Sequence, residues 1–412
     1  MNIKEKAIAI MKDMFVCDNC LGRNFGALLT GLTNEQRGET IRRYLAFLVD
    51  SGENVNINEL NFSGIKFRNI KIKTKEPSKC SLCNNLFKIL KKKVKPLIKQ
   101  LQKYEFKTLL IGTNLPSDLL EIEQELWNKI GVEWIESFRT EVNRELGKEI
   151  CKIMKKEMDR KTPDITILYD FQKNSVKLQV RSLYIFGKYQ KLVRGIPQTK
   201  WKRKFYKTSV QEIIAKPLLK HSKTADTSFH GEGREDIDVR CVGWRPFVIE
   251  ILNPIRRYFD LKKIEKEINK SSKVKVKELR YTNKNVVRDI KTVKHDKTYL
   301  ATVTFDNEIK NLNKLARLKN TVISQNTPIR VIRRRTDKLR RRLVKDIKFK
   351  KLDNKKIQLK ITSQSGLYIK ELITGDEGRT SPNVSDLLDN KVKKIELDVI
   401  KIHEKLPKQP FL

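Results

Sequence analysis

The amino-terminal half of the chain carries mostly helical hydrophobic patterns, interrupted by short extended ones. Apolar residues recur at helical spacing over three segments, residues 34–49, 82–104 and 136–158. We expect a helix in each, with the second broken at Pro96, because proline lacks the amide hydrogen that a helix interior needs. The apolar segment 106–112 predicts a buried strand, and alternation over 176–180 predicts a half-buried one. This mixture indicates an α+β amino-terminal region.

Strand patterns dominate the second half. Every other residue is apolar over 299–305 and again over 357–361, which predicts two strands that each bury one face. A helix is expected from Asp260, where apolar residues return at helical spacing. The second half is therefore predicted to be a mixed antiparallel α+β domain.

A basic, turn-rich segment at residues 194–207 separates the two halves. A chain of 412 residues exceeds what one hydrophobic core usually holds, and its 39% hydrophobic content is enough to fold two. We therefore place a boundary near residue 200, with one domain at residues 1–200 and a second at residues 201–412.

The charge balance points to a polyanionic partner. Lysine and arginine number 89 against 49 aspartate and glutamate residues, which gives a formal net charge of +40 and a pI near 9.9. Such an excess attracts phosphates whatever their sequence context, and the attraction weakens as salt rises. Nucleic acid is therefore the expected partner.

Several other classes of protein are disfavoured. No apolar run approaches the ~20 residues that span a bilayer, and the amino terminus carries no secretory signal, so we expect a cytoplasmic protein with no membrane partner. The chain has no Gly-x-Gly-x-x-Gly loop and no Walker A motif, which argues against a methyltransferase or a thiolating enzyme. The four histidines are scattered and form no evident metal cluster or triad. A monomer is expected.

Four of the six cysteines form two Cys-x-x-Cys pairs, Cys17 with Cys20 and Cys80 with Cys83. Each pair places two thiolates on one tight turn, so two pairs brought together by folding complete a tetrahedron with no open position for chemistry. In a chain without a sign of export, this pattern predicts a structural Zn²⁺ site. A reduced thiol pair or a redox motif is the alternative.

A dense cluster of arginines lies at residues 330–335 and continues at 340–342. It alternates like a strand at its start, and guanidinium groups in such a cluster suit phosphate oxygens. Arg330 and Arg334 are the two that we expect to contact the substrate. A solvated charged face is the alternative interpretation. Three aromatic residues within 184–189, interleaved with basic ones, are suited either to stacking on unpaired bases or to core packing.

An acidic island interrupts this basic chain at residues 233–240, where Glu235, Asp236 and Asp238 stand between arginines. A protein that attracts a polyanion would not place three carboxylates where the polyanion lands unless one of them performs a reaction. We assign that role to Asp236 and a supporting role to the other two, with Asp238 pairing with Arg240. Taken alone, a turn carboxylate that pairs with a neighbouring arginine is the commoner interpretation.

Four blocks of the sequence together resemble one family. The blocks are residues 17–23 with 33–38, residues 194–201, residues 233–240 with 245–247, and residues 368–371 with 375–383. The family is the archaeal and eukaryotic type of tRNA pseudouridine synthase that acts on the T-loop. The resemblance spans nearly the whole chain. It implies a THUMP-bearing amino-terminal region that binds tRNA, a carboxy-terminal catalytic domain, and uridines 54 and 55 of tRNA as targets.

The resemblance also implies roles for single residues. Asp236 matches the essential aspartate of the family, and Tyr299 resembles the active-site tyrosine that stacks on the target base. Lys370 resembles the basic residue that pairs with this aspartate. We further place four residues at the substrate site: Arg234, Arg330, Arg334 and Tyr368.

Conversion of uridine to pseudouridine needs no cofactor and no outside energy. It needs one ionised carboxylate, and a cation such as Lys370 or Arg234 within ion-pair distance would favour that charge state. The sequence leaves open whether Asp236 attacks the base, attacks the sugar or acts as a base on the sugar. Extruding a uridine from a folded loop costs a few kcal/mol, and stacking on Tyr299 at ~1–3 kcal/mol would offset much of that cost.

Two other functions compete with this one. In a metal-dependent nuclease, Glu235, Asp236 and Asp238 would hold Mg²⁺ near a phosphate, and strand cleavage would require the metal. In a non-catalytic tRNA chaperone, the arginine clusters would suffice and Asp236 would be dispensable.

Overall fold

The structure is a computed structural model, and it describes residues 1–72, 76–77, 79–201, 205–333 and 335–404. The chain divides into two compact units, Met1–Arg181 and Ser182–Leu412. The division falls earlier than the boundary near residue 200 expected from the turn-rich segment. It does so because β5 (Leu183–Lys191), which precedes that segment, hydrogen-bonds to strands of the second unit.

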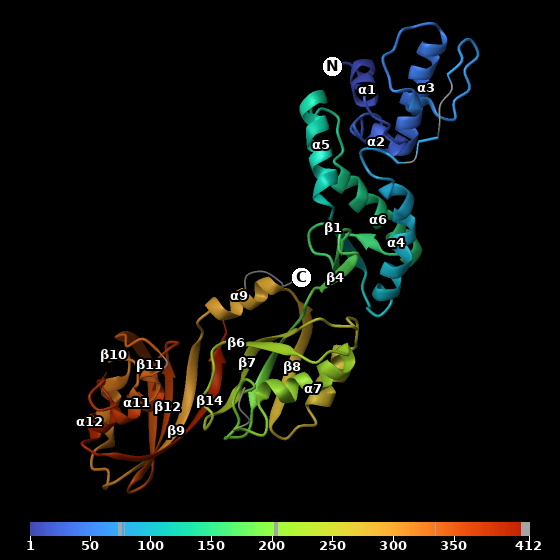
Figure 1. Ribbon diagram of the computed structural model, residues 1–412. Coiled ribbons are helices and arrows are strands. Elements are labelled where there is room, and N and C mark those ends of the chain that lie inside the picture. The colour runs from blue at the N-terminus through green and yellow to red at the C-terminus, as the bar shows by residue number, and fades with distance from the viewer. Residues whose placement is uncertain (73–75, 78, 202–204, 334, 405–412) are drawn as a thin grey trace. The chain divides into compact units, whose positions relative to one another are not determined.

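The first unit is an α+β unit of helices around a small sheet, as the sequence predicts (Figure 1). Its helices are α1 (Ile3–Met11), α2 (Asp18–Arg23), α3 (Asn34–Asp50), η1 (Glu59–Phe62), α4 (Leu86–Leu101), α5 (Ser117–Ile130) and α6 (Phe138–Met154). Its strands are β1 (Thr108–Asn114), β2 (Glu157–Met158), β3 (Ile165–Asp170) and β4 (Ser175–Val180). They lie in the order β2-β1-β3-β4, with β4 antiparallel and the rest parallel.

The predicted helices and strands of this unit are confirmed, with one correction. Helix α4 continues through Pro96 and is not broken there. A proline inside a helix costs a backbone hydrogen bond, but α4 buries Leu90, Val94, Leu97 and Leu101 along one face. Burial of four such side chains outweighs one lost hydrogen bond.

Helices α2 and α3 approach each other so closely that only glycine fits at two contacts. A Cβ atom on Gly22 would lie 1.8 Å from the carbonyl oxygen of Asn34, and one on Gly38 would lie 2.0 Å from the carbonyl oxygen of Asp18. These distances are far inside van der Waals contact. The backbone packing of α2 on α3 therefore fixes the turn that begins at Cys17.

The second unit is built on one ten-stranded sheet. Besides β5, its strands are β6 (Thr227–Gly231), β7 (Arg240–Ile251), β8 (Val274–Thr282), β9 (Asp296–Phe305), β10 (Thr321–Gln325), β11 (Arg340–Asp353), β12 (Lys356–Ser363), β13 (Thr380–Ser381) and β14 (Val392–His403). Its helices are α7 (Val210–Ser222), α8 (Leu261–Ile268), α9 (Lys284–Thr292), η2 (Leu312–Leu318), α10 (Ile329–Ile332), α11 (Ile369–Thr374) and α12 (Val384–Leu388).

The strand order of this sheet is β13-β10-β11-β12-β9-β14-β7-β5-β8, with β6 paired to β7. Neighbouring strands are antiparallel except β14 and β7, which pair in parallel through Asp398 with Arg240 and Val399 with Cys241. This parallel pair joins the two halves of the sheet, and the mixed, mainly antiparallel domain predicted from the sequence is confirmed. Among the described residues, no helix is long and apolar enough to cross a bilayer.

Each half of the sheet has its own hydrophobic core. One core gathers around β9, β11, β12 and β14, and another packs α7 and α8 against β5, β7 and β8. Figure 1 shows α11 and α12 beside the first half and α7 beside the second. The predicted apolar faces at 299–305 and 357–361 lie in the first core. Because the cores meet along β14 and β7, the loop that precedes β7 lies between them.

The segment from Arg330 differs from its expected extended form. Residues Ile329–Ile332 form the short helix α10, and none of its residues is buried. A strand there would need a partner for its backbone groups and an apolar face to bury. Two apolar residues between arginines do not supply such a face.

Gly38→Ala is expected to destabilise the first unit by at least ~1–3 kcal/mol, because the added methyl group forces α2 and α3 apart. Calorimetry of the full chain measures the melting of this unit, and Thr40→Ala, on the exposed side of α3, is the matched control. Equal melting temperatures for the two variants would contradict the close packing of these helices.

Candidate active site

The loop between β6 and β7, residues 232–239, carries Asp236. A buried lysine binds the backbone of this loop. Lys191, at the end of β5, is fully buried. Its Nζ donates to the carbonyl oxygens of Ile196 at 3.1 Å, Asp236 at 2.9 Å and Ile237 at 3.2 Å. Burial lowers the pKa of Lys191, while the nearby Glu235 opposes that shift. One ammonium group thus holds the loop's backbone at Asp236.

Arg194 anchors the same loop from its far end. Its Nη1 donates to the carbonyl oxygens of Asp238 at 2.8 Å and of Leu397, on β14, at 2.6 Å. Its Nη2 lies 2.6 Å from Asp398. The adjoining Gly195, at φ +83°, donates its N–H to the carbonyl of Ile237 at 2.9 Å. The loop is therefore tied to β14 as well as to β5.

Glu235, although it lines the cavity described below, places its carboxylate in a buried cluster of charged groups. Its carboxylate lies 3.0 Å from Nε of Arg245 and 4.0 Å from Nζ of Lys191, and both cations are buried. The Tyr189 hydroxyl donates to the same carboxylate at 3.1 Å. Gln198 donates to Tyr189 at 2.8 Å and to the carbonyl of Gly233 at 2.9 Å. The supporting role predicted for Glu235 agrees with this position.

Asp236 is half-exposed and faces two cations. Its Oδ2 lies 3.0 Å from Nη1 of Arg330 and 3.6 Å from Nζ of Lys370. Arg330 is held in turn by Glu371, whose Oε1 accepts from its Nε at 2.5 Å. Lys370 was the expected partner of Asp236, and the structure adds Arg330 as a closer one. Arg234 forms no ion pair with any residue in the described part of the chain.

The sequence predicted that Asp238 would pair with Arg240, and this prediction is wrong, because Asp238 pairs with Lys370. Nζ of Lys370 donates to both carboxylate oxygens at 2.7 and 2.8 Å. Burial alone would raise the pKa of Asp238, but the hydrogen bond and charge of Lys370 outweigh it and lower this pKa. Arg240 instead makes a two-point contact with Asp398, in keeping with the register of β7 and β14.

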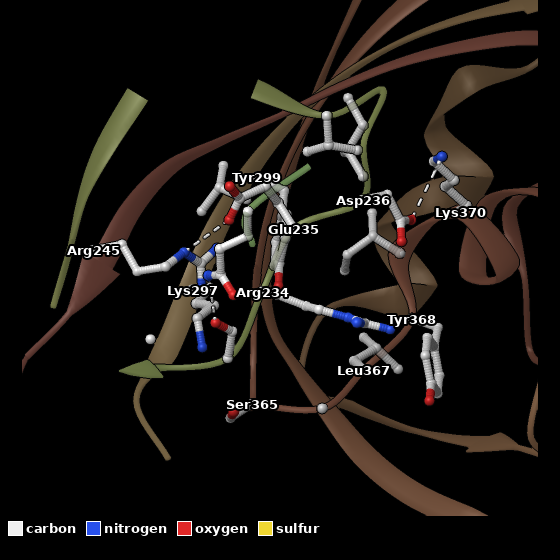
Figure 2. Close-up of a pocket in the computed structure, with 18 of the residues that line it drawn as sticks. Arg234, Glu235, Asp236, Arg245, Lys297, Tyr299, Ser365, Leu367, Tyr368 and Lys370 are labelled. Atoms are coloured by element: carbon white, nitrogen blue, oxygen red, sulfur yellow. Dashed lines mark hydrogen bonds and ion pairs between the residues drawn. The ribbon is translucent and has the colours of Figure 1, made fainter. Parts of the chain in front are cut away.

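A cavity of about 690 Å³ opens beside this loop (Figure 2). The six described residues that the sequence assigns to catalysis or substrate binding all line it: Arg234, Asp236, Tyr299, Arg330, Tyr368 and Lys370. They come from one loop, one strand and two short helices that are far apart in the chain. Arg334 lies outside the described residues.

The two tyrosines of the cavity are held in different ways. Tyr299 stands on β9, and burial raises the pKa of its hydroxyl to about 12, so it is protonated at neutral pH. Tyr368 begins α11, where the side chain of Gln325 bonds both its N–H at 2.8 Å and its carbonyl at 3.0 Å. Arg335 donates to the Tyr368 hydroxyl at 2.9 Å. The position of Tyr368 on the cavity wall is therefore fixed at both its backbone and its hydroxyl.

Sequence reasoning missed the buried groups that position the loop, Lys191, Arg245 and Tyr189. One sign was available, because Lys191 shares the inward face of β5 with Ile185 and Tyr189. A lysine on an apolar face needs buried acceptors. The identity of those acceptors, three backbone carbonyls, has no signature in the sequence.

The four predicted cysteine ligands meet in the first unit. The sulfur atoms of Cys17, Cys20, Cys80 and Cys83 all lie within 4.8 Å of one another, and those of Cys17 and Cys83 are 3.7 Å apart. Tetrahedral Zn²⁺ with bonds of ~2.3 Å places its sulfurs ~3.8 Å apart. Three of the four thiols are buried. This set can hold a metal ion, and it is the only such set among the described residues.

The carboxylates of the acidic island do not form a magnesium site. Glu235 turns toward Arg245, Asp236 toward Arg330 and Asp238 toward Lys370. Each negative charge therefore has its own cation, and no common position lies between the three. This arrangement disfavours the metal-dependent nuclease.

Comparisons with known proteins agree with the two units. A family described as "Pus10, C-terminal" matches residues 184–403, and one described as "Pus10 THUMP domain, archaeal" matches residues 94–170. "tRNA pseudouridine synthase Pus10" of Pyrococcus furiosus is 39% identical over 97% of this chain and 98% of its own length. The protein of the same name from Thermofilum pendens is 34% identical over 97% of this chain and 95% of its own.

A solved structure, "Crystal Structure of a Cbf5-Nop10-Gar1 Complex", is 14% identical and covers 51% of this chain and 47% of its own, with a TM-score of 0.31. A likeness at that level supports no conclusion about function.

The two family matches, together with relatives that match nearly the whole chain, identify a pseudouridine synthase, an isomerase. Because the matches cover more than half of the chain and nearly all of it in the curated relatives, the chain belongs to the Pus10 family. The family resemblance identified from the sequence is confirmed.

Glu235→Gln is expected to lower the free energy of unfolding by ~3–5 kcal/mol, because it leaves Arg245 and Lys191 buried without their counter-charge. Urea unfolding of the full chain measures the loss. Glu377→Gln, at an exposed position without an ion pair in the described residues, should stay within ~0.5 kcal/mol of the parent. If both variants unfold alike, the buried cluster does not support the loop.

Proposed function

We propose that this protein isomerises uridines 54 and 55 in the T-loop of tRNA to pseudouridine, with Asp236 as the essential carboxylate. The main support is the convergence of Asp236, its two cations and two tyrosines on one cavity in a member of this family. The tRNA substrate rests on the names of the curated relatives and on the THUMP match. The T-loop positions rest on the family resemblance of the sequence.

The charges around Asp236 suit its proposed role. Arg330 and Lys370 both approach its Oδ2, which favours the ionised form that each of the candidate mechanisms requires. Half-exposure leaves the group open to a nucleotide in the cavity. A carboxylate of this kind can attack the uridine, attack the ribose or remove a proton from the ribose.

The remaining cavity residues are proposed to bind and orient the uridine. Tyr299 would stack on the extruded base and keep its hydroxyl proton as a hydrogen-bond donor. Tyr368 would line the opposite part of the wall, and Arg234, extended across the cavity in Figure 2, would meet a phosphate. We propose the same role for Arg334.

The reaction conserves atoms without a cofactor. The bond between ribose C1′ and N1 of uracil breaks, the base turns, and C1′ bonds to C5. The C5 proton leaves and N1 gains a proton. After the first bond breaks and before the second forms, the residues of the cavity must hold both the base and the ribose in place. They must also exclude water that would react with the ribose.

The test is to map pseudouridine and strand breaks at single-nucleotide resolution after incubating the purified chain with an unmodified tRNA transcript, once in chelator and once with added magnesium. We expect product at positions 54 and 55 with the parent, and none with Asp236→Asn. Because Asn keeps the shape of the side chain, tRNA affinity should change by no more than roughly threefold. Glu377→Gln serves as the active control.

Three outcomes would contradict the proposal. Strand cleavage that needs magnesium would restore the nuclease. Tight binding without product from the parent would favour the tRNA chaperone. Product elsewhere in the tRNA would keep the enzyme class and overturn the T-loop assignment.

We also propose that the four-cysteine site holds a structural Zn²⁺. Its four sulfurs all lie within 4.8 Å of one another, as they would around a tetrahedral ion with Zn–S bonds of ~2.3 Å.

 Three of the four cysteines are buried, and the sulfurs of Cys17 and Cys83 are 3.7 Å apart, which supports a structural ion. No substrate chemistry is assigned to this ion.

Cys80→Ser is expected to release about one equivalent of Zn²⁺ and to lower the melting temperature of the first unit, since structural zinc contributes directly to folding. Metal analysis of the purified full chain, together with calorimetry, measures both effects. Cys151→Ser, on α6 and outside the cluster, should keep its metal. Unchanged zinc content in Cys80→Ser would refute the site.

The cellular location, partner and oligomeric state of the protein form part of the same proposal. A tRNA-modifying enzyme acts where tRNA matures, and we propose a cytoplasmic monomer with tRNA as its partner and no small-molecule cofactor. Size-exclusion chromatography with light scattering tests the monomer.

A further inference from the structure

A second cavity of about 550 Å³ lies next to the catalytic one in the second unit. Four parts of the sheet line it: the start of β9, the start of β11, the loop that follows β12 and the end of β14. Arg342 and Ser365 line both cavities. A nucleotide in the catalytic cavity would therefore have its backbone next to the second one.

The charges of this second cavity are unbalanced. Its single carboxylate, Asp296, is already paired with Lys345. Lys294 and Arg342 have no carboxylate partner in the described part of the chain. Two positive charges thus line a polar cavity without a carboxylate partner in the described residues. Such an arrangement attracts a phosphate.

Arg342 also has an unmet hydrogen bond. Its Nη1 donates to the carbonyl of Arg341 at 2.8 Å, but its Nε is buried and has no partner among the described residues. Gly366, at φ +90°, lies against this group, and a Cβ there would come within 3.3 Å of Nε. A buried donor without an acceptor is costly. An anion in the cavity would supply acceptors to this guanidinium.

Two histidines complete the wall, and each is oriented by a contact of its own. Nδ1 of His295 lies 2.8 Å from Glu232, and Nε2 of His403 lies 2.7 Å from the Thr298 hydroxyl. Burial and then the charge of Lys401 lower the pKa of His403, so this ring is neutral at pH 7. Oriented rings add hydrogen-bonding groups to the cavity.

We propose that this second cavity binds a backbone phosphate of the substrate RNA, next to the uridine held by the catalytic cavity. The inference rests on the proposed function for the identity of the RNA. Lys294 and Arg342 would contact the phosphate, and they would set which nucleotide enters the catalytic cavity by fixing the backbone beside it.

The experiment removes single charges from the RNA and from the protein. Unmodified tRNA is assembled with one neutral methylphosphonate at each phosphate around the T-loop uridines, and affinity for the full chain is measured at fixed salt. We expect a methylphosphonate at one position to lower the parent's affinity for tRNA by about tenfold, which is typical of the loss of a charged hydrogen bond. Lys294→Ala should bind tRNA without a methylphosphonate more weakly than the parent does. A methylphosphonate at that same position should then lower the affinity of Lys294→Ala by less than about twofold.

Two further proteins sharpen the comparison. Arg342→Gln should show the same insensitivity at the same phosphate. Lys262→Ala removes an exposed lysine from α8, outside both cavities, and should retain the parent's pattern. Lys294 is exposed, so its removal leaves folding intact, as the melting temperature will verify.

The inference is overturned if the parent and Lys294→Ala lose the same affinity at every position. If inorganic phosphate binds the parent but not Lys294→Ala, while every methylphosphonate affects both alike, the ligand is free phosphate and the RNA assignment is wrong. If the parent loses affinity at one phosphate, the two variants do not, and no pseudouridine forms, the phosphate site is supported and the proposed activity is contradicted.

Discussion

The loop of Asp236 depends on positive charge that is buried beneath it. Lys191 binds three backbone carbonyls there, and Glu235 and Arg245 complete a cluster that no solvent reaches. Burying an ammonium group is costly unless every donor finds an acceptor. Once the acceptors are in place, the loop has little freedom to move. The loop can then present Asp236 at the cavity while its neighbour Glu235 stays paired with the buried Arg245.

Strand pairing brings the other cavity residues to this loop. Tyr299 lies on β9, which pairs with β14, and β14 pairs with β7 directly after the loop. Lys370 and Arg330 stand on short helices that follow β12 and β10. Two cations from separate elements then share Asp236 and its neighbour Asp238. Sheet register and charge pairing thus act together on one cavity.

Much of this arrangement could be predicted from the sequence, because local patterns carry it. The apolar alternation of β9 and β12 and the cysteine spacing each depend on residues close together in the chain. Arg330 could be placed at the site, but its pairing with Asp236 depends on a fold that brings residues 236 and 330 together. Asp238 was assigned to the nearby Arg240, whereas Lys370 takes it. Partners that are distant in sequence leave no local pattern.

The parallel contact of β14 with β7 has a consequence for the order of events during synthesis. Asp398 forms ion pairs with both Arg240 and Arg194, and Arg240 directly follows the loop of Asp236. In a nascent chain, the loop and its lysine anchor, Lys191, leave the ribosome well before Asp398 does. Until then, one side of the loop has no strand beside it. The strand pairing beside the loop of Asp236 is therefore completed only after β14 has been synthesised and has paired with β7.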